Sequence, residues 1–132
     1  PPRSTLFPYT TLFRSESTLA ALNLLDELDG RKVAVLGDML ELGQYEKRGH
    51  EMVGVRAAEV ADELIVVGER ARMISVAAEN AGMPADTIIE LDDVLDVIEF
   101  LKDRLQSRDV VLVKGSHGMK MDRIVSALEQ RR

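Results

Sequence analysis

The chain has 132 residues, 45% of them hydrophobic, and a formal net charge of −6. This size suits one compact domain, and an acidic chain without a basic stripe is unsuited to binding nucleic acid. The sequence has no cysteine, which excludes disulfides and thiolate metal sites. Its apolar runs are too short to span a bilayer and it shows no signal peptide, so we expect a cytoplasmic domain.

The first fifteen residues, PPRSTLFPYTTLFRS, differ from the rest of the chain. They contain no acidic residue but three of the five aromatic residues, Phe7, Tyr9 and Phe13. All fifteen can be encoded by one frame of a widely used sequencing-library adapter. Residues 1–15 are therefore predicted to be a non-native, adapter-like tail outside the fold. A native, disordered N-terminal tail is the alternative.

The first predicted element after the tail is a helix over residues 17–28, with Ser17 as its N-cap and Asp29–Gly30 at its end. Continuously apolar runs then predict four strands that are covered on both faces. These runs are residues 32–37, 63–68, 87–91 and 109–115. Apolar residues at helical spacing lie between the strands and after the last one. They fall within residues 53–61, 73–81, 94–105 and 121–128.

This order predicts an α/β fold, a three-layer Rossmann-like domain with a mostly parallel sheet flanked by helices. In such domains a strand normally precedes the first helix, whereas the pattern here opens on a helix. We therefore expect the domain to lack its first strand, which would leave one edge of the sheet unpaired.

Three of the four predicted strands end in glycine, at Gly37, Gly68 and Gly115. Because parallel strands all end on the same side, these glycines are expected to lie together at the carboxyl ends of the strands, beyond which open parallel sheets bind their ligands. Asp38 and Glu41, which follow the first strand, could hold a ribose hydroxyl, an ammonium group or a magnesium-bound water. The residues alone favour the other interpretation, in which such a carboxylate is a solvated turn acid.

The segment KGSHGMK, residues 114–120, is the richest candidate site. Gly115 and Gly118 allow close backbone approach, and the free N–H groups at the start of the next helix favour an anion. Lys114 and Lys120 add charges suited to phosphate or carboxylate. The spacing does not match a P-loop, and the chain contains no G-x-G-x-x-G. An anion site and a structural turn both remain open.

The other polar candidates carry weaker signals. His117 could donate to a substrate or could simply be exposed, and His50 is interpreted as structural or solvent-facing. The two histidines share no ligand spacing, so no metal site is expected. Glu69 and Arg70 are interpreted as capping and solvating the start of a helix.

Three segments carry a family resemblance: RKVAVLGDMLELGQYEKRGHEMVG, LIVVGERA and DVVLVKGSHGMKMDRIVSAL. From about Glu16 to its end, the chain resembles the C-terminal domain of the Mur ligases. Residues 16–132 are therefore assigned to that domain, truncated at its N-terminal end. The family typically has KGSRGMKME, from which His117 and Asp122 depart.

The resemblance implies an ATP-dependent amide ligase that adds D-alanyl-D-alanine to UDP-N-acetylmuramoyl-tripeptide in peptidoglycan synthesis. In that family a central domain, absent from this sequence, binds most of the ATP and Mg²⁺, and the C-terminal domain closes over the substrates. The implied substrate-binding residues are Lys114, Gly115, Ser116, Gly118, Met119 and Lys120. Those implied along the interdomain cleft near the nucleotide are Asp38, Met39 and Glu41. No catalytic residue is expected in this fragment, which alone should be inactive.

A free-standing flavodoxin-like binding module or a receiver-type signalling domain is the main alternative. A receiver needs acids after the first strand, an aspartate after the third and a lysine after the last. Asp38, Asp92 or Asp93, and Lys114 loosely imitate this arrangement. A protein-interaction domain is a further possibility, in which replacing Lys114 and Lys120 would change no chemistry.

Overall fold

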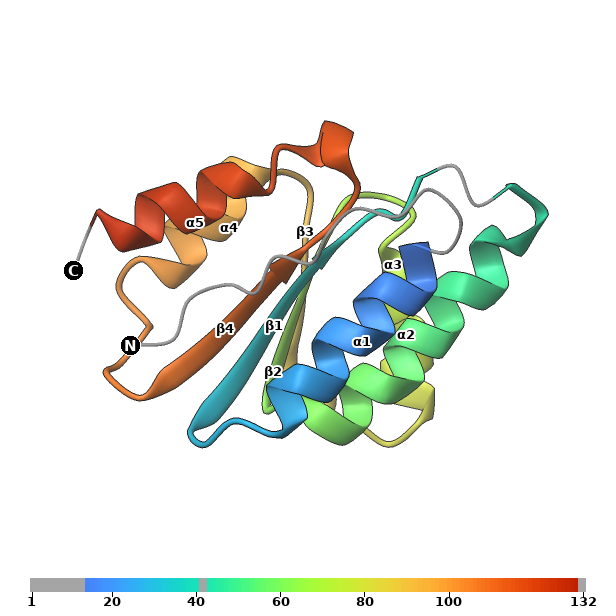
Figure 1. The fold of residues 1–132 in the computed structure, drawn as a ribbon, viewed down its shortest axis with the longest axis horizontal. Helices are drawn as coiled ribbons and strands as arrows, with labels where there is room; N and C mark the ends of the chain where they lie inside the picture. The colour runs from blue at the N-terminus through green and yellow to red at the C-terminus, as the bar shows by residue number, and fades with distance from the viewer. Residues whose placement is uncertain (1–13, 41–42, 131–132) are drawn as a thin grey trace.

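The computed structural model describes residues 14–40 and 43–130, which form a four-stranded sheet between two layers of helices (Figure 1). The strands are β1 (Arg31–Gly37), β2 (Glu63–Val67), β3 (Ile88–Leu91) and β4 (Asp109–Lys114). The helices are α1 (Arg14–Asp26), α2 (Glu46–Val60), α3 (Arg72–Asn80), α4 (Val94–Leu101) and α5 (Asp122–Glu129). The 3-10 turns are η1 (Gly43–Tyr45), η2 (Ala85–Thr87) and η3 (His117–Met119). None of these described helices is both long and apolar enough to cross a membrane.

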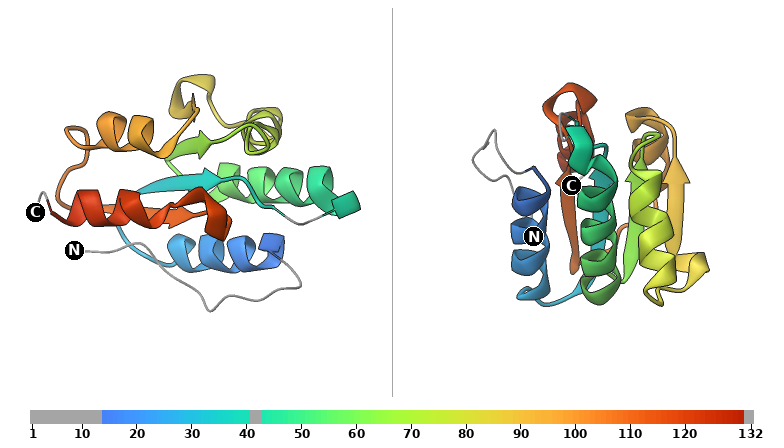
Figure 2. Two further views of the ribbon diagram at one scale, coloured as in Figure 1. Left: turned by 90° about the horizontal axis from the view of Figure 1, so that it is seen from above. Right: turned by 90° about the vertical axis from the view of Figure 1, so that its right-hand side faces the viewer.

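The strands lie in the order β3-β2-β1-β4, and every pair is parallel. Helices α1, α2 and α3 cover one face of the sheet, and α4 and α5 cover the other (Figures 1 and 2). The predicted three-layer α/β fold with a parallel sheet is therefore confirmed. The four predicted strands are present, with ends shifted by one residue.

Alternate residues of the strands enter two separate hydrophobic clusters. On β1, Ala34 and Leu36 belong to the cluster beneath α1, α2 and α3, whereas Val33 and Val35 belong to the one beneath α4 and α5. All four side chains are at most 1% exposed. Because both faces are covered, the strand reads as continuously apolar rather than alternating.

The sheet changes its direction of winding between β1 and β4. From β1 the chain moves through α2 to β2 and through α3 to β3, on one face; it then crosses the other face through α4 to reach β4. Because the crossovers are right-handed and run in opposite directions along the sheet, the chain leaves β1 toward one face and leaves β4 toward the other. The loops that follow these two adjacent strands therefore diverge. Such a switch point is where open α/β sheets bind ligands.

Helix α1 starts earlier than predicted. It begins at Arg14 rather than Ser17, so Arg14 and Ser15 of the predicted tail are helical, and it ends at Asp26. Arginine and serine tolerate a helix, and Glu16 in the first turn is favourable toward the helix dipole. The division into residues 1–15 and 16–132 stays a prediction, as does the missing first strand.

Charged side chains form a network at the amino ends of the strands. Arg31 donates hydrogen bonds of 3.3 and 2.9 Å to Asp109. Glu63 accepts a 2.9 Å bond from Arg104 and lies 3.8 Å from Arg31. Burial raises the pKa of the Asp109 carboxyl, but hydrogen bonds from Arg31 and the Gln106 backbone, with the charge of Arg31, outweigh burial and lower it.

Acid should remove the stability that ionised Asp109 supplies. A carboxylate whose pKa is lower in the folded state stabilises the fold above its unfolded value of about 3.9 and loses that contribution as pH falls through the folded value. We expect Asp109→Asn to be less stable than wild type at neutral pH, by about 1 kcal/mol or less because Arg31 is partly exposed. Urea unfolding from about pH 6 to about pH 3 should show this difference shrinking. A difference independent of pH would contradict the assignment.

Candidate functional site

The turns after β1, β2 and β4 lie at one edge of the sheet, at the top of Figure 1. The prediction that Gly37, Gly68 and Gly115 gather at one edge is therefore confirmed. We call residues 38–40 after β1 and 115–120 after β4 the rim. Glu41, predicted to line the cleft, lies outside the described residues.

Gly37 and Gly115, where β1 and β4 end, make room for the protein's own atoms. A Cβ on Gly37 would lie 3.1 Å from Sδ of Met121, and a Cβ on Gly115 would lie 2.9 Å from Cγ of Met121. Gly115 was predicted to admit a ligand to the backbone, but the space beside it is filled by this methionine. A Cβ on Gly118, in contrast, would meet no described atom within 4 Å. Close backbone approach by a ligand is thus possible at Gly118.

Asp38 is 6% exposed and joins the turn after β1 to the turn after β2. Its Oδ1 accepts a 2.7 Å hydrogen bond from the backbone N–H of Ala71, at the start of α3, and its Oδ2 lies 3.9 Å from Arg70. Gly68 has φ +108°, and a Cβ there would lie 2.5 Å from the carboxylate. The idea of a solvated turn acid is therefore wrong. Asp38, in the turn after β1, therefore caps the start of α3, where the helix N–H groups favour a negative charge.

Met39 and His50 hold the same turn from the opposite side. The Met39 side chain is 2% exposed and packs in the core, so its backbone rather than its side chain belongs to the rim. Its N–H donates a 3.0 Å hydrogen bond to Nε2 of His50, whose Nδ1 lies 2.7 Å from the carbonyl oxygen of Glu46. His50 is fully buried, so of its two interpretations the structural one is confirmed.

Ser116 joins the loop after β4 to the turn after β1. It is 5% exposed, and its N–H donates a 2.9 Å hydrogen bond to the carbonyl oxygen of Asp38. Its hydroxyl accepts a short hydrogen bond from the N–H of Leu40. This side chain, predicted to bind substrate, therefore holds the two halves of the rim together.

The lysines and Met119 occupy different environments. Lys114 is half-buried and, by strand alternation, shares a face of β4 with Leu112. Met119 is half-buried and packs against the cluster beneath α4 and α5. Lys120 is exposed and has φ +57°, a left-handed conformation uncommon outside glycine. The side chain of His117 lies outside the described part of the structure.

Among its described side chains, the rim thus combines a hydrogen-bonded base with one exposed cation, Lys120. Asp38, Ser116 and His50 fix the backbone, while Lys120 and the open side of Gly118 face outward. Such an arrangement can position an anionic group. Within residues 14–40 and 43–130, no three His, Asp or Glu side chains come together to hold a metal ion, so the described residues do not fit a magnesium site by themselves.

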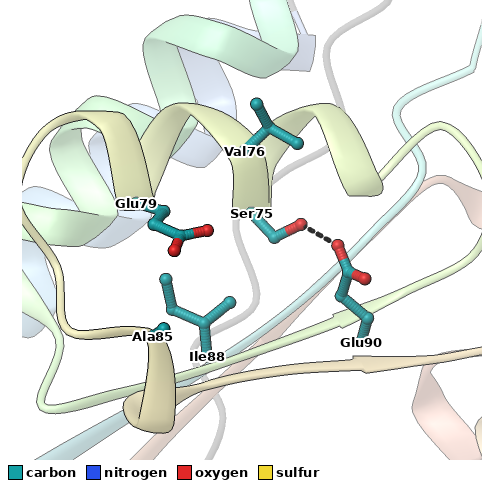
Figure 3. Close-up of a pocket in the computed structure, with 6 residues that line it drawn as sticks. All are labelled: Ser75, Val76, Glu79, Ala85, Ile88 and Glu90. Atoms are coloured by element: carbon teal, nitrogen blue, oxygen red, sulfur yellow. Dashed lines mark hydrogen bonds between the residues drawn. The ribbon is translucent and has the colours of Figure 1, made fainter.

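A separate groove lies beside β3, at the sheet edge opposite β4 (Figure 3). It has a volume of about 340 Å³, and Ser75 donates a hydrogen bond to the carboxylate of Glu90 across it. Its lining residues are Ser75, Val76, Glu79, Ala85, Ile88 and Glu90. They belong to α3, η2 and β3, so the groove is not part of the rim.

The structure does not gather the residues that a receiver would need. Asp92 and Asp93 follow β3, which β2 separates from β1 and Asp38. Asp92 accepts a 2.8 Å hydrogen bond from Arg72, and Asp93 caps α4 by accepting from the N–H of Asp96. Asp92 thus pairs with the first residue of α3, and Asp93 caps α4.

Sequence reasoning missed two residues that support the rim. Arg70, interpreted as a solvated cap, donates a 2.7 Å hydrogen bond from Nε to the carboxylate of Glu46 at the start of α2. Met121, read only as part of a helical stripe, fills the space beside the glycines. Glu46 and Arg70 are 24 residues apart in the chain, so no local sequence pattern predicts that they pair.

The comparisons with known proteins agree with this fold. The family described as "Mur ligase, glutamate ligase domain" matches residues 14–117. The chain is 32% identical over 115 residues to the UDP-N-acetylmuramoyl-tripeptide–D-alanyl-D-alanine ligase of Bacillus subtilis, covering 85% of this chain and 25% of that protein. It is 35% identical over 118 residues to the Escherichia coli ligase of the same name, covering 86% and 24%.

Solved structures show the same architecture. The MurF ligase of Thermotoga maritima, in complex with ADP, superposes with a TM-score of 0.71 at 25% identity, covering 98% of this chain and 27% of that one. MurF of Acinetobacter baumannii shares the fold, with a TM-score of 0.75 at 23% identity and coverage of 98% and 27%. The chain spans about a quarter of the length of the curated relatives that it matches. It belongs to the Mur ligase family, whose C-terminal glutamate ligase domain it resembles across most of its length.

Proposed function

We propose that this chain is the C-terminal part of an ATP-dependent ligase that joins D-alanyl-D-alanine to UDP-N-acetylmuramoyl-tripeptide, and that its rim faces the substrates. The names of the relatives support the proposed ligation reaction. The location of the rim at the switch point of the sheet supports its assignment as the substrate-binding site. The single observation that carries the site is the exposed Lys120 on a loop that the hydrogen bonds of the buried Ser116 attach to the turn after β1.

The reaction would proceed through an acyl phosphate of the tripeptide carboxylate, which the amine of the dipeptide attacks with release of phosphate. ATP would supply the phosphoryl group, and ATP and Mg²⁺ would bind mainly in the part of the relatives that this chain does not cover. The rim would contribute position and charge: Lys120 would attract the carboxylate of the dipeptide or the acyl phosphate. Gly118 would leave room for either group beside the backbone.

A chimaera tests the proposal. Residues 16–132 would replace the matching C-terminal part of the Bacillus subtilis relative, and ADP formation would be measured with each substrate omitted in turn. We expect ADP formation to require both the UDP-sugar tripeptide and D-alanyl-D-alanine, and we expect the 132-residue chain alone to form no ADP. A folded chimaera whose ADP formation does not depend on D-alanyl-D-alanine would contradict the proposal. Labelling of an aspartate in the chain by acetyl phosphate would also contradict it.

Lys120→Ala in the chimaera should raise the KM for D-alanyl-D-alanine by about tenfold or more, because a charge contact to a carboxylate is lost. Lys120→Arg should keep most of the activity. Steady-state kinetics with varied dipeptide measures both, and an unchanged KM in Lys120→Ala would contradict the assignment.

Lys120→Gly distinguishes the effect of losing the lysine charge from the effect of the left-handed backbone at this position. Glycine removes the cost of a left-handed residue, about 1 kcal/mol. We therefore expect Lys120→Gly to lose the same activity as Lys120→Ala while being more stable in urea unfolding.

A further inference from the structure

The turn after β1 is held by contacts that form a closed ring. Asp38 lies 3.9 Å from Arg70, and Arg70 donates a 2.7 Å hydrogen bond to the side chain of Glu46. The carbonyl of Glu46 lies 2.7 Å from Nδ1 of His50, and Nε2 of His50 accepts a 3.0 Å bond from Met39, the neighbour of Asp38. Arg70 and Glu46 are partly exposed, whereas His50 is fully buried. On the α2 side of the ring, which Glu46 and His50 form, the buried link is therefore the imidazole.

The partners of His50 determine its protonation. A backbone N–H can only donate, so Nε2 must accept from Met39 and carries no proton. A backbone carbonyl can only accept, so Nδ1 must carry the proton toward Glu46. Both nitrogens of a neutral ring are thus in use between two backbone groups. Neither lysine nor arginine could replace the ring, since neither has an acceptor.

Three consecutive residues of the turn, Asp38, Met39 and Leu40, form hydrogen bonds alternately with the loop after β4 and with α2. The carbonyl of Asp38 and the N–H of Leu40 both bond to Ser116, on the loop after β4. The N–H of Met39, between them, bonds to His50 on α2. The histidine therefore sets how far the turn, and with it Ser116 and the loop carrying Lys120, lies from α2.

We propose that His50 is a positioning residue of the ligase, a neutral imidazole that clamps the backbone of Met39 and thereby fixes the rim for the dipeptide. This rests on the proposed function of the rim. Because His50 is fully buried, it would act through the turn after β1 rather than by touching substrate. A misplacement of about 1 Å by such a residue can cost about 100-fold in rate.

The first test uses the 132-residue chain and needs no ligase activity. Amide hydrogen exchange would be followed at Met39 and at Ile65 of β2, a fully buried reference. In His50→Leu, which fills the space without hydrogen-bonding groups, Met39 should exchange at least about tenfold faster relative to Ile65. In Val53→Ala, one turn further along α2 and equally buried, the two amides should change together. An unchanged ratio in His50→Leu would overturn the clamp.

The second test introduces the same variants into the chimaera. His50→Leu should lower kcat/KM for D-alanyl-D-alanine by about tenfold or more beyond Val53→Ala, and His50→Gln should recover part of it, because its amide can both accept and donate. Equal losses in His50→Leu and Val53→Ala would reduce His50 to an ordinary core residue and overturn the positioning role. A chimaera inactive even without these variants would count against the proposed function, whereas the exchange ratio would still decide the clamp.

Discussion

Gly54→Ala should destabilise the protein by about 3 kcal/mol, although alanine is the better helix former by about 1 kcal/mol. Gly54 lies in α2 against α3, and a Cβ there would be 2.4 Å from the carbonyl oxygen of Ile74. It would also be 2.8 Å from Cβ of Ala77 and 3.2 Å from the backbone nitrogen of Ala78. Backbone atoms of a packed helix cannot move aside singly, so the two helices would have to separate.

Urea unfolding of the 132-residue chain measures this effect. Gly118→Ala is the control, because a Cβ there meets open space, and it should change stability by no more than about 0.5 kcal/mol. Adding Ala77→Gly to Gly54→Ala should restore little of the lost stability, since the clash with the Ile74 carbonyl oxygen remains. A Gly54→Ala variant as stable as wild type would show that α2 and α3 do not pack this closely.

Asp38→Ala should cost about 2–3 kcal/mol of stability and should also impair the proposed ligase. The substitution leaves the buried N–H of Ala71 without its 2.7 Å partner, removes a negative charge from the start of α3 and deprives Arg70 of one of its two acids. It also opens space over Gly68. The turn after β1 would lose its connection to the turn after β2.

Two aspartate variants serve as controls for that result. Asp38→Asn keeps an oxygen for Ala71 but loses the charge, so it should cost about 1 kcal/mol. Asp93→Ala removes an exposed, local cap of α4 and should cost about 1 kcal/mol without affecting dipeptide use. Urea unfolding and the KM for D-alanyl-D-alanine in the chimaera measure these effects. Equal costs for Asp38→Ala and Asp93→Ala would contradict the buried role of Asp38.

The amino-acid pattern alone determined the layers of the fold and showed that the candidate site lies at the carboxyl ends of the strands. Strands covered on both faces must be continuously apolar, and helices covering a sheet must repeat their apolar residues at 3.6-residue spacing, so both are readable locally. Gly37, Gly68 and Gly115 were placed at one edge because parallel strands all end on the same side. The family resemblance also came from local motifs, and the family match over residues 14–117 confirms it.

The tertiary structure decided what the polar residues of the rim do. The sequence predicts Asp38 to be a solvated acid or a ligand-binding carboxylate, but it is a buried cap because Ala71 lies beside it only once β1 and β2 pair. His50 and Ser116 acquire their roles in the same way, from backbone groups 11 and 76 residues distant in the chain. Periodicity reports which face of an element is buried, but a hydrogen bond between distant segments depends on distances that arise only when those segments pack.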